Sequence, residues 1–326
     1  MDPISTRKLT IGILTCDDFD GLFFTIQSIR LYHPEVLGEL EFLILDNRPE
    51  SAHGAAVERF THWIKQPVRY VKVTDGQGTA LRNRLFELAT TEYVLCLDSH
   101  VLLAAGALRK LIDFFDAGKD AHGLLQGPLL FDNMEEVATH FDPVWRAQMW
   151  GIWGKDERGF DPAAAPFEIP AQGLGVFACR KAAWLGFHPR FSGFGGEECY
   201  IHEKFRQAGR RTLCLPFLRW VHRFERPAGV PYRLHTEDRV RNYLIGHAEL
   251  RLDPAPVLEH FANVLPKERL AALQKEAAPP QEVKQPEEVA PAKEEGTEAK
   301  SSTLPFWIGT EKAEPATGVV AAKCVA

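Results

Sequence analysis

The chain has 326 residues, of which 45% are hydrophobic, 25% charged and 10% aromatic. This composition is typical of a globular protein, and the length allows one large domain or two small ones. The formal charge of -6 argues against broad nucleic-acid binding, which usually requires a basic surface. No run reaches the ~18 apolar residues of a membrane helix, and the N-terminus lacks the apolar core of a signal peptide. The six cysteines form no C-x-x-C pair. We therefore expect a cytoplasmic protein without a transmembrane segment.

The N-terminal part of the chain alternates apolar strands with amphipathic helices. Strand patterns cover residues 9–15, 40–46, 68–75 and 93–98, and helix patterns cover 21–34 and 78–90. This alternation predicts an α/β fold with a Rossmann-like, mostly parallel sheet that helices cover on both faces. No G-x-G-x-x-G motif follows the first strand, which weighs against a dinucleotide-binding protein.

Polar residues stand where these strands end, and ligands bind beyond the carboxyl ends of parallel strands. The residues at these ends are Thr15, Asp46, Asp75 and Asp98. Asp98 and His100 are two residues apart, so they project to the same side of the strand end. The pair is competent to bind a metal ion. The alternative is that Asp98 caps the following helix and His100 is an ordinary surface histidine.

The second half of the chain contains a glycine pair followed by a glutamate pair. Gly195 and Gly196 allow a tight turn and a close approach to a ligand, and Glu197 and Glu198 then begin a predicted helix. The glutamates either complement the helix dipole or place a carboxylate at the mouth of a site. Further along, the last apolar strand pattern ends in His222.

Two other segments are distinctive in composition. Residues 131–173 contain Trp145, Trp150 and Trp153, which either stack on a sugar ring or pack in the core. From about residue 276 the chain is rich in Pro, Ala, Glu and Lys, which predicts a disordered tail. The one apolar island of that tail, at 304–309, either docks on the body or on a partner, or is a chance cluster.

Five segments share their order and approximate spacing with a known family: "LTIGILTCDDFDGLFFTIQSI", "LILDNRPES", "TALRNRLFELATTEYVLCLDSH", "GLGVFACRKAAW" and "GFGGEECYIHEKFRQAGRRTLCLPFLRWVHRF". Over roughly residues 8–250 the chain resembles the family 2 glycosyltransferases of the GT-A fold. The Asp-Ser-His and Gly-Gly-Glu motifs look most like those of polypeptide N-acetylgalactosaminyltransferase catalytic domains. Phe194 departs from that pattern, because it stands where those enzymes have tryptophan.

The resemblance implies a hexosyl- or N-acetylhexosaminyltransferase that takes its sugar from a UDP-sugar and uses Mn²⁺ or Mg²⁺. The implied metal ligands are Asp98, His100 and His222, a mixed carboxylate and imidazole set. The cation would neutralise charge that develops on the leaving diphosphate. The donor-binding residues implied by the resemblance are Thr15, Asp46, Arg82, Asn83 and Asp98. Among them, Asp46 would bind the uracil ring and Thr15 would form the edge of the base pocket. Arg82 and Asn83 have a plainer alternative as ordinary helix residues.

The stereochemistry stays open between two patterns. Glu198 falls where inverting relatives have the aspartate that deprotonates the acceptor hydroxyl, and it is one methylene longer. The retaining N-acetylgalactosaminyltransferases have asparagine there, and the Asp-x-His motif points toward them. We predict an inverting transfer with Glu198 as base and Glu197 beside it, because a carboxylate is present where one is needed.

With the tail indicated by its composition, the chain divides into a GT-A domain at 1–252, a helical extension at 253–275 and the tail at 276–326. Within the domain, 8–130 would bind the nucleotide sugar and 131–252 would supply the acceptor and catalytic side. The acceptor stays open among carbohydrate, lipid and protein. One alternative function is a sugar-phosphate nucleotidyltransferase, although the loop after the first strand, "TCDDFDG", is acidic where such enzymes carry a basic residue. A non-catalytic nucleotide- or carbohydrate-binding relative is the other.

Overall fold

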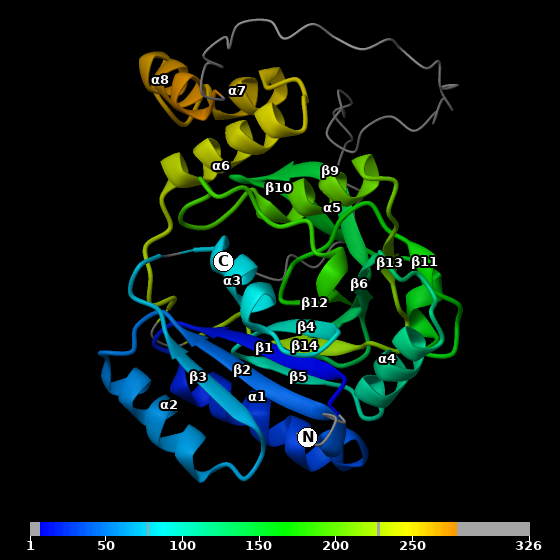
Figure 1. The fold of residues 1–326 in the computed structure, drawn as a ribbon. Helices are drawn as coiled ribbons and strands as arrows, with labels where there is room; N and C mark the ends of the chain where they lie inside the picture. The colour runs from blue at the N-terminus through cyan, green and yellow to red at the C-terminus, as the bar shows by residue number, and fades with distance from the viewer. Residues whose placement is uncertain (1–6, 77, 227–228, 279–326) are drawn as a thin grey trace, which may run out of the picture.

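Eight strands form the central sheet of the computed structural model, which describes residues 7–76, 78–226 and 229–278 (Figure 1). In spatial order they are β11 (Phe167–Glu168), β13 (Thr212–Cys214), β6 (Leu124–Gln126), β12 (Val176–Arg180), β4 (Tyr93–Asp98), β1 (Leu9–Thr15), β2 (Leu40–Asp46) and β3 (Val68–Lys72). The strands β4, β1, β2 and β3 are parallel, whereas β12 runs antiparallel to both of its neighbours. The predicted α/β fold with a mostly parallel sheet is confirmed.

The register of the parallel strands places the predicted polar residues at one edge of the sheet. Thr15 lies opposite Asp46 in the β1–β2 pair, and Leu14 lies opposite Asp98 in the β1–β4 pair. Three strand ends therefore meet at this edge, as expected for crossover connections that return each strand in the same direction.

A second, four-stranded sheet brings the two histidines together. Its strands, in spatial order, are β5 (Val101–Leu103), β14 (Trp220–His222), β7 (Leu129–Leu130) and β8 (Val137–Ala138). In the antiparallel β5–β14 pair, His222 lies opposite Val101. Because His100 directly precedes β5, this pairing puts two residues that are far apart in the sequence next to each other. A separate hairpin is formed by β9 (His140–Arg146) and β10 (Met149–Gly154).

Helices cover both faces of the central sheet (Figure 1). On one face lie α1 (Phe19–Tyr32), α2 (Ala52–Trp63) and α4 (Ala107–Asp116), and on the other lie α3 (Leu81–Leu88), α5 (Glu197–Gln207) and α6 (Thr236–Glu249). Alternate residues of each strand supply the two cores: Phe42 and Ile44 of β2 belong to one, and Leu43 and Leu45 to the other. Burying each such side chain contributes about 1.5–3 kcal/mol, so the site is built on a rigid scaffold.

The helices α7 (Ala255–Phe261) and α8 (Lys267–Ala277) follow α6, and the second of them packs against it. They occupy the segment predicted as a helical extension. The tail was predicted from residue 276, but α8 continues to Ala277, and residues 279–326 of the predicted tail lie outside the described residues. Across the described ranges, no helix has both the length and the hydropathy needed to span a membrane.

The largest differences from the sequence prediction concern β3, α3 and α2. β3 ends at Lys72 and α3 covers only Leu81–Leu88, because a glycine-containing loop between them pairs with Gly193 through an isolated bridge at Gly78. The helix α2 had no counterpart in the prediction. Its start is fixed by Ser51, whose side chain accepts a hydrogen bond from the Gly54 backbone N–H, which is a common N-cap arrangement.

Candidate active site

A cavity of about 220 Å³ lies at the carboxyl edge of the central sheet. Its wall draws on β1, β4, β14, α3, the start of α5 and the start of α6. The predicted residues that line it are Thr15, Arg82, Asp98, His100, Glu197, Glu198 and His222. A pocket that gathers polar and ionisable groups from several separate elements is the usual form of an active site.

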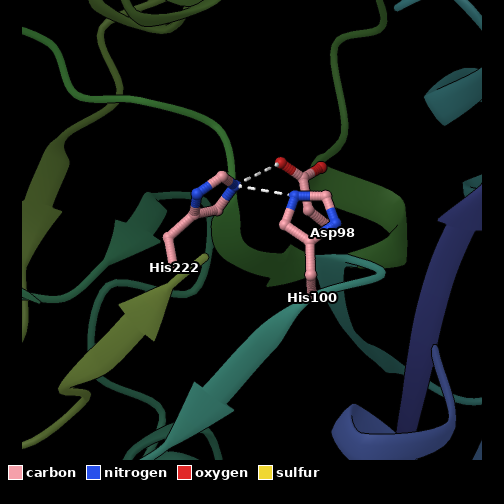
Figure 2. Close-up of side chains that lie close together, drawn as sticks. All are labelled: Asp98, His100 and His222. Atoms are coloured by element: carbon pink, nitrogen blue, oxygen red, sulfur yellow. Dashed lines mark hydrogen bonds and ion pairs between the residues drawn. The ribbon is translucent and has the colours of Figure 1, made fainter. Parts of the chain in front are cut away.

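The three predicted metal ligands converge in this cavity (Figure 2). The His222 Nε2 atom lies 3.1 Å from His100 Nε2 and 3.4 Å from Asp98 Oδ2. One ligand atom from each of the three residues lies within 4.8 Å of the others. The two histidine side chains are only 8% and 11% exposed, so their ring nitrogens are largely withdrawn from water.

Asp18 fixes the orientation of the His100 ring. Its Oδ2 atom lies 2.8 Å from His100 Nδ1 and accepts a 2.8 Å hydrogen bond from Ser99 Oγ. The Arg226 guanidinium lies 2.9 Å from His100 Nε2, and a guanidinium only donates. His100 must therefore carry its proton on Nδ1, donate it to Asp18, and leave Nε2 as an acceptor inside the site. A carboxylate behind a histidine is the usual arrangement around metal ligands.

The protonation states also suit metal binding. Burial lowers the pKa of His100 below its usual value, although the Asp18 hydrogen bond opposes this. The ring is therefore neutral near pH 7. Burial works to raise the pKa of Asp98, but the His222 hydrogen bond and the Arg82 charge outweigh it and hold that pKa well below the ordinary range. Arg82 Nη2 lies 3.1 Å from Asp98 Oδ1, so Asp98 is ionised and its second oxygen faces His222.

These residues fit a divalent cation. Two imidazole nitrogens and a carboxylate oxygen face one another. His100 Nε2 carries no proton and Asp98 is ionised, so both have lone pairs available to a cation. His222 Nε2 lies beside two acceptors, His100 Nε2 and the Asp98 carboxylate, so a proton on it would have to be given up when a cation binds. Imidazole ligands suit Mn²⁺ better than Mg²⁺, which prefers oxygen ligands. The two imidazoles of this site therefore favour Mn²⁺.

The two glutamates stand at the start of α5, where Gly195 and Gly196 have φ of 100° and 90°. Such positive values favour glycine. Glu197 is buried, with Oε1 accepting a 2.6 Å hydrogen bond from Thr79 Oγ1. The Glu198 carboxylate makes no side-chain hydrogen bond to any described residue and lines the cavity. Burial, with the charge of Glu197, raises the pKa of Glu198 well above its usual range.

The predicted donor-binding residues do not all reach the cavity. Thr15 does, and its buried hydroxyl has no partner among the described residues. Asp46 is buried, and its carboxylate points away from the cavity lining. It accepts hydrogen bonds from Tyr70 Oη at 2.7 Å and from the Arg48 N–H of the following turn at 2.9 Å. Its role on the uracil ring stays a prediction. Asn47, the next residue, lines the cavity instead.

Arg82 and Asn83 face in different directions from α3. Arg82 reaches Asp98 in the cavity wall. Asn83 ties α3 to the segment after β12, because its Oδ1 accepts hydrogen bonds from Trp184 Nε1 and the Phe187 N–H. The structure therefore does not bring Asn83 to the cavity, and its plainer interpretation as a helix-packing residue agrees with these contacts. Asp75 lies on the surface, where it pairs with Arg84 at 2.7 Å.

The aromatic residues divide between core and cavity. Trp150 is 5% exposed, and Trp145 packs edge-on against it. Trp153 lines the cavity, as does Phe194, whose ring stacks on Tyr232 at 4.1 Å. Core packing thus explains two of the three tryptophans.

The sequence analysis did not find Asp18 or Arg226. Asp18 lies in the acidic "TCDDFDG" loop, which was read only as the absence of a basic loop. The sequence could have indicated Asp18 as the N-cap of the first helix, because aspartate is common at that position. In the structure Asp18 accepts a hydrogen bond from the Gly21 N–H at the start of α1. Arg226 follows β14 in an irregular segment, where no periodic pattern indicates which side chains face the site.

Comparisons with known proteins find a matching family model and similar solved structures. Residues 10–163 match the model described as Glycosyl transferase family 2. A crystal structure of GalNAc-T7 with UDP, GalNAc and Mn²⁺ superposes with a TM-score of 0.61 at 15% sequence identity over 84% of this chain, which spans only 55% of that one. A structure of S. aureus TarS residues 1–349 with UDP-GlcNAc gives a TM-score of 0.50 at 14% identity, covering 83% of this chain and 79% of that one. Comparison with curated protein sequences finds no match.

The fold is thus GT-A-like, similar to that of GalNAc-T7. The predicted resemblance to the family 2 glycosyltransferases is confirmed by the family model, which matches residues 10–163 of this chain.

Proposed function

We propose that this protein is a metal-dependent glycosyltransferase that moves a hexosyl or N-acetylhexosaminyl group from a UDP-sugar to an acceptor. The observation that carries the proposal is the convergence of Asp98, His100 and His222 in the cavity at the carboxyl edge of the sheet. The structures of GalNAc-T7 and TarS were solved with UDP or a UDP-sugar, which supports a uridine nucleotide here.

Each residue around the metal centre has a separate role in the proposal. Asp98, His100 and His222 would hold the divalent cation. When bound, the cation stabilises negative charge on the departing diphosphate. Asp18 keeps the His100 lone pair aimed into the site, and Arg82 holds Asp98 ionised and oriented. The Arg226 guanidinium, which contacts His100, adds positive charge beside the diphosphate.

We assign the uracil end of the donor site to the ends of β1 and β2. The Thr15 hydroxyl, unpartnered among the described residues, and the neighbouring Asn47 line this part of the cavity. A buried hydroxyl without a partner is costly, so a ligand hydrogen bond would stabilise it. Replacing Thr15 with valine should weaken UDP binding several-fold without changing the metal requirement.

Glu198 is the proposed base for the acceptor hydroxyl. Its carboxylate is free of side-chain hydrogen bonds within the described part of the chain, whereas Glu197 is held by Thr79. A base with a pKa raised toward the working pH transfers protons most effectively. The anomeric configuration of the product, read by NMR, tests this role: inversion agrees with a base at Glu198, and retention contradicts it.

The experiment that tests the proposed function is hydrolysis of a panel of nucleotide sugars without acceptor, with Mn²⁺ or with EDTA. We expect one UDP-sugar to be hydrolysed slowly in a Mn²⁺-dependent reaction that the wild-type protein catalyses and His222→Ala does not. His62→Ala, on the exposed face of α2, is the matched control and should retain the activity. Absence of turnover for every donor, together with absence of Mn²⁺-dependent UDP binding, would contradict the proposal.

A further inference from the structure

Two arginines in the cavity wall take no part in the metal centre. Four arginines line the cavity: Arg82, Arg146, Arg226 and Arg239. Arg82 pairs with Asp98, and Arg226 contacts His100, so both belong to the metal centre. Arg146 and Arg239 form no ion pair within residues 7–76, 78–226 and 229–278, and they lie in the wall built by β9 and the first turn of α6.

Arg239 is the more informative of the two because it is only 9% exposed. Among the described residues, its side chain makes one hydrogen bond, a long one of 3.4 Å from Nη1 to the neutral amide oxygen of Gln148, and its Nε has no partner. A buried guanidinium is normally paired with a carboxylate or phosphate. Arg239 therefore has unused donors inside a cavity that is open to ligands.

The backbone of the catalytic loop is shaped around this side chain. A Cβ at position 195 would lie 2.4 Å from Arg239 Nε and 2.8 Å from its Cγ, so only glycine allows Arg239 to pass over the turn. That turn leads directly into Glu198, whose pKa the Arg239 charge lowers against the larger effect of burial. The guanidinium thus lies close to the proposed base without forming an ion pair with it.

We propose that Arg239, with Arg146, binds an anionic group on the acceptor, either a phosphate or a carboxylate. The inference rests on the proposed function and adds the chemical class of the acceptor. The position of Arg239 beside Glu198 places an anion next to the hydroxyl that Glu198 would deprotonate. A planar guanidinium with free donors binds phosphate or carboxylate through paired hydrogen bonds.

The test uses the full chain with its donor side filled. In the presence of saturating UDP and Mn²⁺, glucose 6-phosphate, glucuronate and glucose are each titrated calorimetrically. We expect at least one anionic sugar to bind about tenfold or more tightly than glucose, in line with charge-assisted hydrogen bonds to a buried cation. The two anionic probes distinguish phosphate from carboxylate recognition.

The variants separate recognition from folding. Arg239→Gln and Arg146→Gln should each reduce the preference for the anionic sugar, whereas Arg239→Lys should retain part of it. Arg241→Gln, on the same helix but ion-paired with Asp238 and outside the cavity lining, should leave the preference unchanged. Equal binding of all three sugars by the wild type, or an unchanged preference in Arg239→Gln, overturns the inference while leaving the proposed function intact. Absence of Mn²⁺-dependent UDP binding in the first step overturns both.

Discussion

Replacing Asp18 with asparagine should weaken metal binding without disturbing the fold. The Asp18 Oδ1 atom accepts from the Gly21 N–H at 3.2 Å and from Arg223 at 2.9 Å, while Oδ2 faces His100 Nδ1 and Ser99 Oγ. Asparagine keeps one oxygen for the cap of α1, since it caps helices as well as aspartate. Its amide N–H₂ then faces His100, and two donors cannot share that contact.

His100 must then move its proton to Nε2, which removes the lone pair from the metal centre. Loss of a carboxylate behind a metal-bound histidine costs about 10–100-fold in metal affinity, or about 1.4–2.8 kcal/mol. The affinity is measured by titrating Mn²⁺ in the presence of UDP and following free Mn²⁺ by electron paramagnetic resonance.

The neighbouring Asp17 offers the matched control. Asp17 has a positive φ of 55° that asparagine also tolerates,, and its nearest cation is Arg48 at 3.8 Å. Asp17→Asn should bind Mn²⁺ as the wild type does. A wild-type Mn²⁺ affinity in Asp18→Asn, with an unchanged melting temperature, would refute the assignment of Asp18 as the residue that orients His100.

Four further predictions concern the catalytic turn. Glu198→Gln should keep Mn²⁺-dependent UDP binding but lower the transfer rate by about 10²–10⁴-fold, as followed by UDP release with acceptor. Because the pKa of Glu198 is raised, the wild-type rate should increase with pH as this carboxyl ionises, and a flat profile in the wild type would contradict its role as base. Because burial raises its pKa, Glu198 keeps its proton in the native state above pH 4.5, where the unfolded chain releases it. The free energy of unfolding should therefore fall as the pH rises from 4.5 toward the raised pKa. Glu198→Gln should remove that fall, as measured by denaturant titrations. Gly195→Ala should destabilise the protein by about 1–3 kcal/mol through its φ of 100° and its clash with Arg239, measured as a lower melting temperature,.

The fold was predictable from the sequence where burial on both faces dominates. The strands β1, β2 and β4 are buried along almost their whole length and begin and end where the hydrophobic pattern does. The strand β3 is only half-buried and shorter than its pattern, because the end of a strand at the sheet edge is decided by the loop that follows it. The helix α2 has few buried residues, so its pattern is weak.

The site was predictable where residues stand at the ends of regular elements. Asp98 ends β4, His222 ends β14, and Glu197 begins α5, and all three line the cavity. Asp18, Arg226 and Arg239 depend instead on the path of loops and on which side of a helix start faces inward. Local sequence patterns do not determine such contacts, because they arise from the packing of distant segments.

The direction of a side chain at a strand end was also beyond the sequence. Asp46 ends β2 at the predicted place, but Tyr70 and its own turn hold the carboxylate. The period of two predicts which face a residue takes inside a strand. It no longer applies at the last residue, where the turn decides the side-chain direction.

The central claim is that Asp98, His100 and His222 form a metal centre that binds a uridine diphosphate. Its most direct test is calorimetric titration of UDP into the wild type and His222→Ala, each with Mn²⁺ and with EDTA. We predict that the wild type binds UDP only with Mn²⁺ and that His222→Ala binds it at least tenfold more weakly. UDP binding that is equally strong in EDTA, or unchanged in His222→Ala, would contradict the claim.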